Sequence, residues 1–235
     1  MSNIKQFSLN LLERFGVRVI RESYLNYLIS LPNPNVMDLL ERYRIKCATV
    51  LHIGGHFAEE ANLYREKGIK RAVFIEGDPT IFPFLQDALH NHSDYSCILA
   101  MLSNGNEESE FHVASNEGAS SSLLKPKRHV IERPDITFEE KKLVQTTTLD
   151  SMELGSFDLV VLDVQGAELL VIEGGAVTIG QAKAIWIEVN AGSMYEGAAD
   201  SSEIVKALSK NYVPLYMNMN ENKWGDALFI HRRLL

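Results

Sequence analysis

Apolar residues gather in short runs along the chain, and polar stretches with helically spaced apolar positions separate these runs. The runs at 49–53, 71–76 and 95–101 predict buried strands. The stretches at 57–67 and 81–89 predict helices between the strands. Because strands and helices alternate, the pattern requires a parallel sheet with helices packed on its faces.

The most continuous apolar run is Phe157–Asp163, which is typical of a central parallel strand buried on both faces. A helix is expected from Gly166 to Glu173, and the next strand at 184–189. The same pattern thus resumes in the second half of the chain, as a doubly wound α/β sheet requires.

The chain is expected to end in a helix at 201–211 and two strands, 213–218 and 227–231. A loop as short as the one between these two strands joins antiparallel neighbours. We therefore predict a mostly parallel sheet whose last strand is antiparallel.

Two regions fall outside this alternation. Residues 1–46 keep helical spacing and predict an N-terminal helical extension before a domain at 47–235. The extension is either a cap on the sheet edge, a lid over a site or a dimer contact. Residues 115–142 are rich in Ser, Gly, Pro and charge and predict a loop insertion, flanked by strand candidates at 110–113 and 143–148. Its basic run, 125–129, is either a solvated loop or an anion site.

Charge and composition narrow the function. The net charge of −8 argues against nucleic acid as the main partner, since phosphate binding needs a basic face. Cys47 and Cys97 are interpreted as buried thiols of a reducing compartment. Because no apolar run approaches 18 residues and no signal peptide is evident, we expect a cytoplasmic protein without a membrane segment.

The stretch from His52 to Ala58 joins the first strand to its helix through two glycines, and Glu76 ends the second strand. A glycine turn followed about 20 residues later by a carboxylate is the pattern of a mononucleotide-binding half of a doubly wound fold. The glycines let the backbone approach a ligand, and the carboxylate accepts both hydroxyls of a ribose. Alternatively, Glu76 caps the helix that follows Pro79.

Ligands of open α/β sheets lie beyond the carboxyl ends of the strands. The polar residues expected there are His52, His56, Glu76, Ser103, Asp163 and Glu188. Either histidine is a general base, with a pKa near the operating pH, or a satisfied hydrogen-bonding group.

The carboxylates near the last parallel strands have two interpretations each. Asp163 is a site residue or the N-cap of the next helix. Glu168 lies in the first turn of that helix, where the macrodipole stabilises a carboxylate by roughly 0.3–1 kcal/mol. Glu188 would be costly to bury alone, so it belongs to a site or an ion pair. These three could hold Mg²⁺, but no metal-ligand spacing accompanies them and we predict no metal.

The segment Asp163-Val164-Gln165-Gly166-Ala167-Glu168 resembles the D-V-E-G-A-E segment of FkbM-type methyltransferases. The resemblance covers roughly residues 36–231. It implies the class I Rossmann-like methyltransferase fold, in which the last strand is antiparallel. It also implies S-adenosylmethionine as cofactor and a hydroxyl of a sugar, glycan or small natural product as acceptor.

Other segments carry the same resemblance. The stretch His52–Ala58 is similar to the D-x-G-A-N-x-G cofactor loop, with His52, His56 and Ala58 as departures, and Gln165 replaces a Glu. Phe74–Pro79 resembles the acidic turn that holds the ribose, Ala100–Ser103 a segment near the adenine, and 115–124 a Ser-rich loop. The implied cofactor-binding residues are His52, Gly54, Gly55, His56, Glu76, Gly77, Asp78, Ser103 and Asp163.

The leading hypothesis is therefore an S-adenosylmethionine-dependent O-methyltransferase. Its candidate catalytic residues are Asp163, His56, Glu188 and Glu168. A dinucleotide-dependent oxidoreductase needs G-x-G-x-x-G, but His56 stands two positions after Gly54. A non-catalytic binding or scaffold protein on a methyltransferase fold is the other alternative. A homodimer is compatible with either hypothesis.

Overall fold

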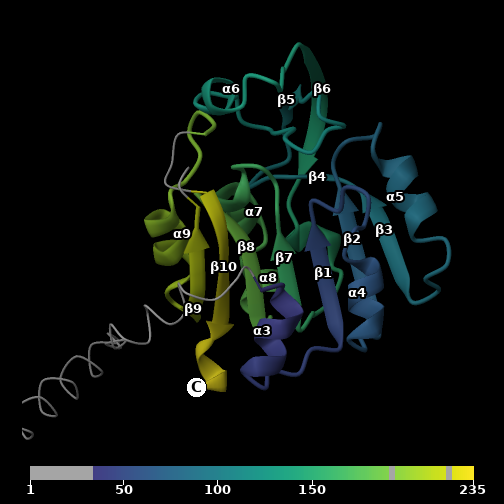
Figure 1. The fold of residues 1–235 in the computed structure, drawn as a ribbon, viewed down its shortest axis with the longest axis vertical. Coiled ribbons are helices and arrows are strands. Elements are labelled where there is room, and N and C mark those ends of the chain that lie inside the picture. The colour runs from purple at the N-terminus through teal and green to yellow at the C-terminus, as the bar shows by residue number, and fades with distance from the viewer. Residues whose placement is uncertain (1–33, 191–193, 221–223) are drawn as a thin grey trace, which may run out of the picture. The chain divides into compact units, whose positions relative to one another are not determined.

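The computed structural model describes residues 34–190, 194–220 and 224–235, so the helices expected before residue 34 lie outside the described residues. A seven-stranded sheet forms the centre of the compact unit Asn35–Leu235 (Figure 1). In sheet order, its strands are β3 (Tyr95–Leu99), β2 (Arg71–Glu76), β1 (Thr49–Ile53), β7 (Leu159–Leu162), β8 (Ala184–Asn190), β10 (Trp224–His231) and β9 (Tyr212–Met219).

Strand direction agrees with the predicted fold class. The five strands from β3 to β8 are parallel, and β10 runs antiparallel to both β8 and β9. All four residues of β7 are buried, as expected for a strand covered on both faces. The predicted doubly wound sheet with an antiparallel last strand is confirmed.

Short helices connect the strands. They are α3 (Val36–Arg42), α4 (Ala61–Glu66), α5 (Phe82–Ala88), α6 (His129–Glu132), α7 (Glu168–Gly174), α8 (Ala176–Gly180) and α9 (Ser201–Leu208), with 3₁₀ turns at Asp150–Met152 and Arg232–Leu234. The sequence pattern did not predict α6 or α8. Asp200 and Glu203 form a capping box that fixes the start of α9.

Two helices begin later than predicted because left-handed residues precede them. Ala58 has a φ of 55°, so the predicted helix at 57–67 begins only at Ala61. Gln165 and Gly166 have φ values of 54° and 97°, which delays the start of α7 to Glu168. These left-handed turns lie at the carboxyl ends of β1 and β7.

Helix α3 belongs to the same compact unit as the sheet, although the sequence analysis assigned residues 36–46 to the N-terminal extension. Its apolar positions, including Leu39 and Leu40, are buried. Lys67, just after α4, forms ion pairs with Asp38 and Glu41 of α3 at 2.8 and 3.0 Å. These contacts tie α3 to the end of α4.

A second sheet of three strands interrupts the alternation. Its strands are β4 (Met101–Leu102), β6 (Glu140–Thr147) and β5 (Glu108–Val113). The prediction of a single strand at 95–101 is therefore wrong. Strand β3 pairs with β2 only as far as Leu99, and Met101 pairs with Thr146 of β6 instead. The predicted loop at 115–142 contains α6 and the start of β6. This second sheet lies beyond the upper ends of β1, β2 and β7 (Figure 1).

In the described part of the chain, no helix is long and apolar enough to cross a membrane. Both cysteines are free thiols, but each is only partly buried, whereas the sequence predicted buried thiols.

Candidate functional site

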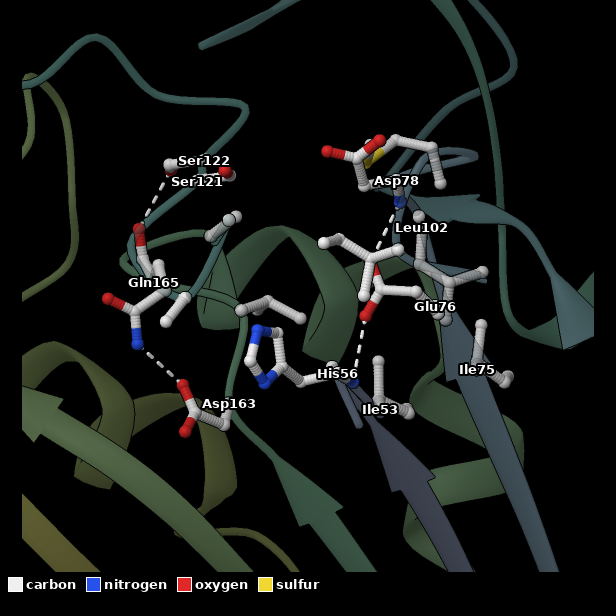
Figure 2. Close-up of a pocket in the computed structure, with 18 of the residues that line it drawn as sticks. Ile53, His56, Ile75, Glu76, Asp78, Leu102, Ser121, Ser122, Asp163 and Gln165 are labelled. Carbon is white, nitrogen blue, oxygen red and sulfur yellow. Dashed lines mark hydrogen bonds between the residues drawn. The ribbon is translucent and has the colours of Figure 1, made fainter. Parts of the chain in front are cut away.

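A cavity of about 370 Å³ opens at the carboxyl ends of β1, β2 and β7, where an open α/β sheet is expected to bind its ligand. The turn after β1, the end of β2 and the segment 163–167 form its floor. Residues 100–102 and the loop at 118–123 complete the wall. Figure 2 shows Glu76 and Asp78 on one side of this cavity, Asp163 and Gln165 on the other, and His56 between them.

The glycine turn Gly54-Gly55 lies between the carboxyl ends of β2 and β7. The backbone N–H groups of Gly54 and Gly55 donate hydrogen bonds to the carbonyl of Ile75, at 2.9 and 3.0 Å. Gly54 has a φ of 86°, and a Cβ there would lie 1.7 Å from the carbonyl oxygen of Asp163. A glycine is therefore required at this position, and its bare backbone faces the cavity.

Two backbone donors fix the carboxylate of Glu76. Its Oε2 accepts from the N–H of His56 at 2.9 Å, and its Oε1 accepts from the N–H of Asp78 at 2.7 Å. Burial raises the pKa of Glu76, and the backbone hydrogen bonds oppose this shift. The predicted alternative, a cap for the following helix, is not seen, because α5 has no side-chain cap.

Asp78 is buried and borders the cavity. Its Oδ1 accepts from the N–H and hydroxyl of Thr80, at 2.8 and 2.7 Å, and from Nζ of Lys142 at 3.2 Å. These bonds hold the turn after β2 against β6. The sequence offered no signal for Lys142, since the contact spans 64 positions between two separate sheets.

His52 lies among aromatic residues, although it is one of the residues bordering the cavity. Its Nδ1 is 3.0 Å from the hydroxyl of Tyr64, and its ring stacks on Phe74 at 5.2 Å. Burial lowers the pKa of His52 to about 4, so the ring is neutral at pH 7.

His56 points into the cavity, and both of its ring nitrogens contact oxygen atoms. Nδ1 is 2.9 Å from a carboxylate oxygen of Glu59, and Nε2 is 3.0 Å from the backbone carbonyl of Glu117. Since both oxygens are acceptors, this arrangement requires both nitrogens to donate. Burial alone would lower the pKa of His56, but the bonds to Glu59 and Glu117 raise it. The His56 ring thus links Glu117, in the Ser-rich loop, to the glycine turn.

Asp163, Gln165 and Glu188 form a hydrogen-bonded chain beside the cavity. The amide nitrogen of Gln165 donates to Asp163 Oδ1 at 2.7 Å and to Glu188 Oε2 at 2.9 Å. Asp163 is exposed, whereas burial, with the nearby charge of Asp163, raises the pKa of Glu188 well above its usual range. The alternative that Asp163 caps α7 is not observed, because Ala167 is the N-cap residue and no side chain bonds there.

Four residues of the predicted site do not border this cavity: Gly55, Ser103, Glu168 and Glu188. Glu168 is buried and accepts the N–H groups of Val164 and Gly166, both at 3.1 Å, and burial raises its pKa to about 7. Through these two hydrogen bonds, Glu168 orders the loop between β7 and α7. Ser103 is buried beside Asn104, and Gly55 packs against Phe74 and Leu85.

The Ser-rich loop supplies wall residues that were not among the site residues predicted from the sequence. The hydroxyl of Ser122 donates to the carbonyl of Gln165 at 2.7 Å, and Ser121 and Gly118 border the same cavity. The only sequence signal was the resemblance of the 115–124 segment to a family loop. Within the described ranges, no group of three or more His, Cys, Asp or Glu side chains is arranged to hold a metal ion.

Comparison with known proteins gives matches at the level of family and fold. The family model of the methyltransferase FkbM domain matches residues 51–214. The 2-O-methyltransferase NoeI of Sinorhizobium fredii is 28% identical over 210 residues, which cover 85% of this chain and 84% of that protein. Among solved structures, the ribosomal protein L11 methylase of Lactobacillus delbrueckii subsp. bulgaricus matches with a TM-score of 0.47 and 13% identity, over 83% of this chain and 76% of that chain. TrmK of M. capricolum, solved with S-adenosyl-homocysteine, matches with a TM-score of 0.42 and 11% identity, over 88% and 67% of the two chains.

Proposed function

The chain belongs to the FkbM methyltransferase family, and we propose that it transfers the methyl group of S-adenosylmethionine to a hydroxyl oxygen of a sugar, glycan or small natural product. The family assignment makes it a methyltransferase with S-adenosylmethionine as cofactor. It favours this hypothesis over the oxidoreductase and scaffold alternatives.

The observation that carries the proposal is the placement of Glu76. Its carboxylate is held by two backbone N–H groups at the end of β2, beside a glycine turn that only glycine can form. Each carboxylate oxygen keeps a second acceptor position, as ribose hydroxyls require. The volume of about 370 Å³ lies within the usual range of small-molecule sites. We therefore assign Glu76, Gly54 and His56 to the donor site.

The donor supplies an electrophilic methyl group, so the protein has to position the acceptor and take its proton. Asp163 is our choice for the base, because it is an exposed carboxylate on the cavity wall. His56 donates through both nitrogens, and the raised pKa of Glu188 favours its protonated form. Holding the two reactants in line contributes most of the remaining rate enhancement.

The class of acceptor is inferred from the family resemblance and from the relative NoeI, whose name describes transfer to an oxygen atom. We also infer a cytoplasmic location, because both cysteines are free thiols. Two predictions rest on the sequence alone: that nucleic acid is not the main partner, and that the protein can form a homodimer.

The direct test is methyl transfer from isotopically labelled S-adenosylmethionine to a panel of oligosaccharides and hydroxylated natural products. We expect label in a product that survives alkali, because methyl ethers resist hydrolysis and methyl esters do not. Label found only in alkali-labile or nitrogen-linked products would exclude O-methylation of hydroxyls. No transfer to any member of the panel would also count against the proposed acceptor class.

A further inference from the structure

A second cavity, of about 90 Å³, adjoins the first near α6, β8 and the start of β10. The polar and aromatic side chains that border it include His129, Glu132, Gln165, Glu188, Tyr195 and Trp224. None of these residues except Gln165 borders the donor cavity. The second cavity is therefore a distinct space that shares one wall residue with the donor site.

Two buried polar atoms beside this cavity lack a partner within the described part of the protein. They are Nδ1 of His129 and Oε2 of Glu132. A buried polar atom without a hydrogen bond is costly, and native proteins keep few of them. Both belong to α6, the short helix inside the loop insertion. They indicate a ligand that carries hydrogen-bonding groups.

The rest of the lining combines aromatic rings with a carboxyl group. Tyr195 is buried, with its ring 5.5 Å from that of His129, whereas Trp224 is 37% exposed at the edge of the cavity. Glu188 adds a buried carboxyl group. Aromatic faces cover the apolar C–H surface of a sugar ring, and carboxyl and imidazole groups bond its hydroxyls.

The size of the cavity limits what enters it. A volume of about 90 Å³ corresponds to roughly three water molecules, each of which occupies about 30 Å³ in the liquid. One edge of a sugar ring fits, and the remainder of a longer glycan has to extend past the exposed Trp224.

Gln165 connects the two cavities chemically. Its amide bonds Asp163 on the donor side and Glu188 on the second side, and its Oε1 lies 3.3 Å from the hydroxyl of Tyr195. We propose that the second cavity is the acceptor subsite, and that it takes the hydroxyl-bearing edge of one sugar ring beside Gln165. This inference rests on the proposed function, because it assumes a sugar acceptor.

Saturation-transfer NMR tests the subsite without turnover. The probes are methyl glycosides of glucose, galactose and mannose, each added to the protein in the presence of S-adenosylhomocysteine. We expect saturation transfer to at least one glycoside, and loss of that signal in Trp224→Ala and in Glu132→Gln. The matched control is Ile131→Ala, since Ile131 lies on the same helix, is 76% exposed and does not border the cavity.

The outcomes separate this inference from the proposed function. Calorimetry measures the binding of S-adenosylhomocysteine to every variant. Binding like that of the wild type shows that the fold and the donor site are intact. If no glycoside receives saturation, or if both cavity variants keep the wild-type signal, the acceptor subsite is wrong although the donor site stands. If the wild type fails to bind S-adenosylhomocysteine, the proposed function itself is contradicted.

Discussion

Gly54 is the residue at which the backbone tolerates least change. A Cβ there would collide with the carbonyl of Asp163, and its φ of 86° disfavours any side chain. Gly68 has a similar φ of 82° but no atom within 4 Å of its Cβ position. We expect Gly54→Ala to reduce the free energy of unfolding by roughly 3 kcal/mol or more, and Gly68→Ala by about 1 kcal/mol. Denaturant unfolding measures both, and equal losses would show that the close contact with Asp163 is not real.

Gln165 is the second residue at which a single substitution tests the structure. Its amide donates to two carboxyl groups, and the variant Gln165→Glu would place a third carboxyl group between them. Nearby negative charge raises the pKa of such a group, so its ionisation costs stability as the pH rises. We expect the variant to lose stability relative to the wild type as the pH rises above about 4, by roughly 2–3 kcal/mol near pH 8.

The exposed Gln86, on α5, provides the control for this experiment. Gln86→Glu should leave the pH dependence of unfolding nearly unchanged, because its new carboxylate would be solvated. A Gln165→Glu protein with the same pH profile as this control would mean that the bridge between Asp163 and Glu188 does not form.

Residue identities in the donor site were accessible from sequence, but their contacts were not. The spacing of Gly54 and Glu76 follows a general geometric rule, so it placed both residues at strand ends. The bond between Gln165 and Glu188 depends on the side-by-side register of β7 and β8, which no local pattern encodes. The same reason explains why neither Lys142 nor Glu132 was found.

At the scale of elements, His52 joins β1 to α4 and β2. Its ring is buried between Tyr64 and Phe74, and its pKa is lowered to about 4 by burial. The unfolded chain takes up the proton near pH 6.5, while the folded protein does so only near pH 4. Stability from this residue is therefore complete above pH 6.5 and lost as the pH falls toward 4, by about 3 kcal/mol.

We expect His52→Phe to remove this part of the acid destabilisation, as judged from unfolding free energies between pH 7 and pH 4. Tyr64→Phe is the matched control, because it deletes the hydroxyl contact but leaves the imidazole buried. If the His52→Phe protein loses as much stability as the wild type over this range, the histidine is not held neutral by burial.

Element positions were predictable where an apolar run lies inside one sheet. The strands β1 and β2 have the predicted bounds, since each is buried on both sides by neighbouring strands and helices. The division between β3 and β4 was not predictable, because the chain passes from one sheet to the other inside a continuous apolar run. Left-handed residues likewise shortened the first turns of α4 and α7.

At the scale of the whole molecule, the order of the sheet brings the chemistry together. Glu76, Gly54 and Asp163 lie at the carboxyl ends of β2, β1 and β7, which are adjacent in the sheet although 105 residues (54–158) lie between β1 and β7 in the sequence. The insertion between β5 and β7 then covers the strand ends and contributes α6 to the second cavity (Figure 1). The predicted fold class implied that the ends of β1, β2 and β7 meet at one site. The position of α6 could not be inferred, because the sequence of the insertion has no periodicity.

The central claim is that Glu76 anchors the methyl donor, and calorimetric titration with S-adenosylhomocysteine tests it most directly. We predict micromolar binding to the wild type and roughly 100-fold weaker binding to Glu76→Ala, because two hydrogen bonds to a charged group are lost. The exposed Glu108→Ala protein should bind like the wild type. Undiminished binding to a folded Glu76→Ala protein, or no binding to the wild type, would contradict the account.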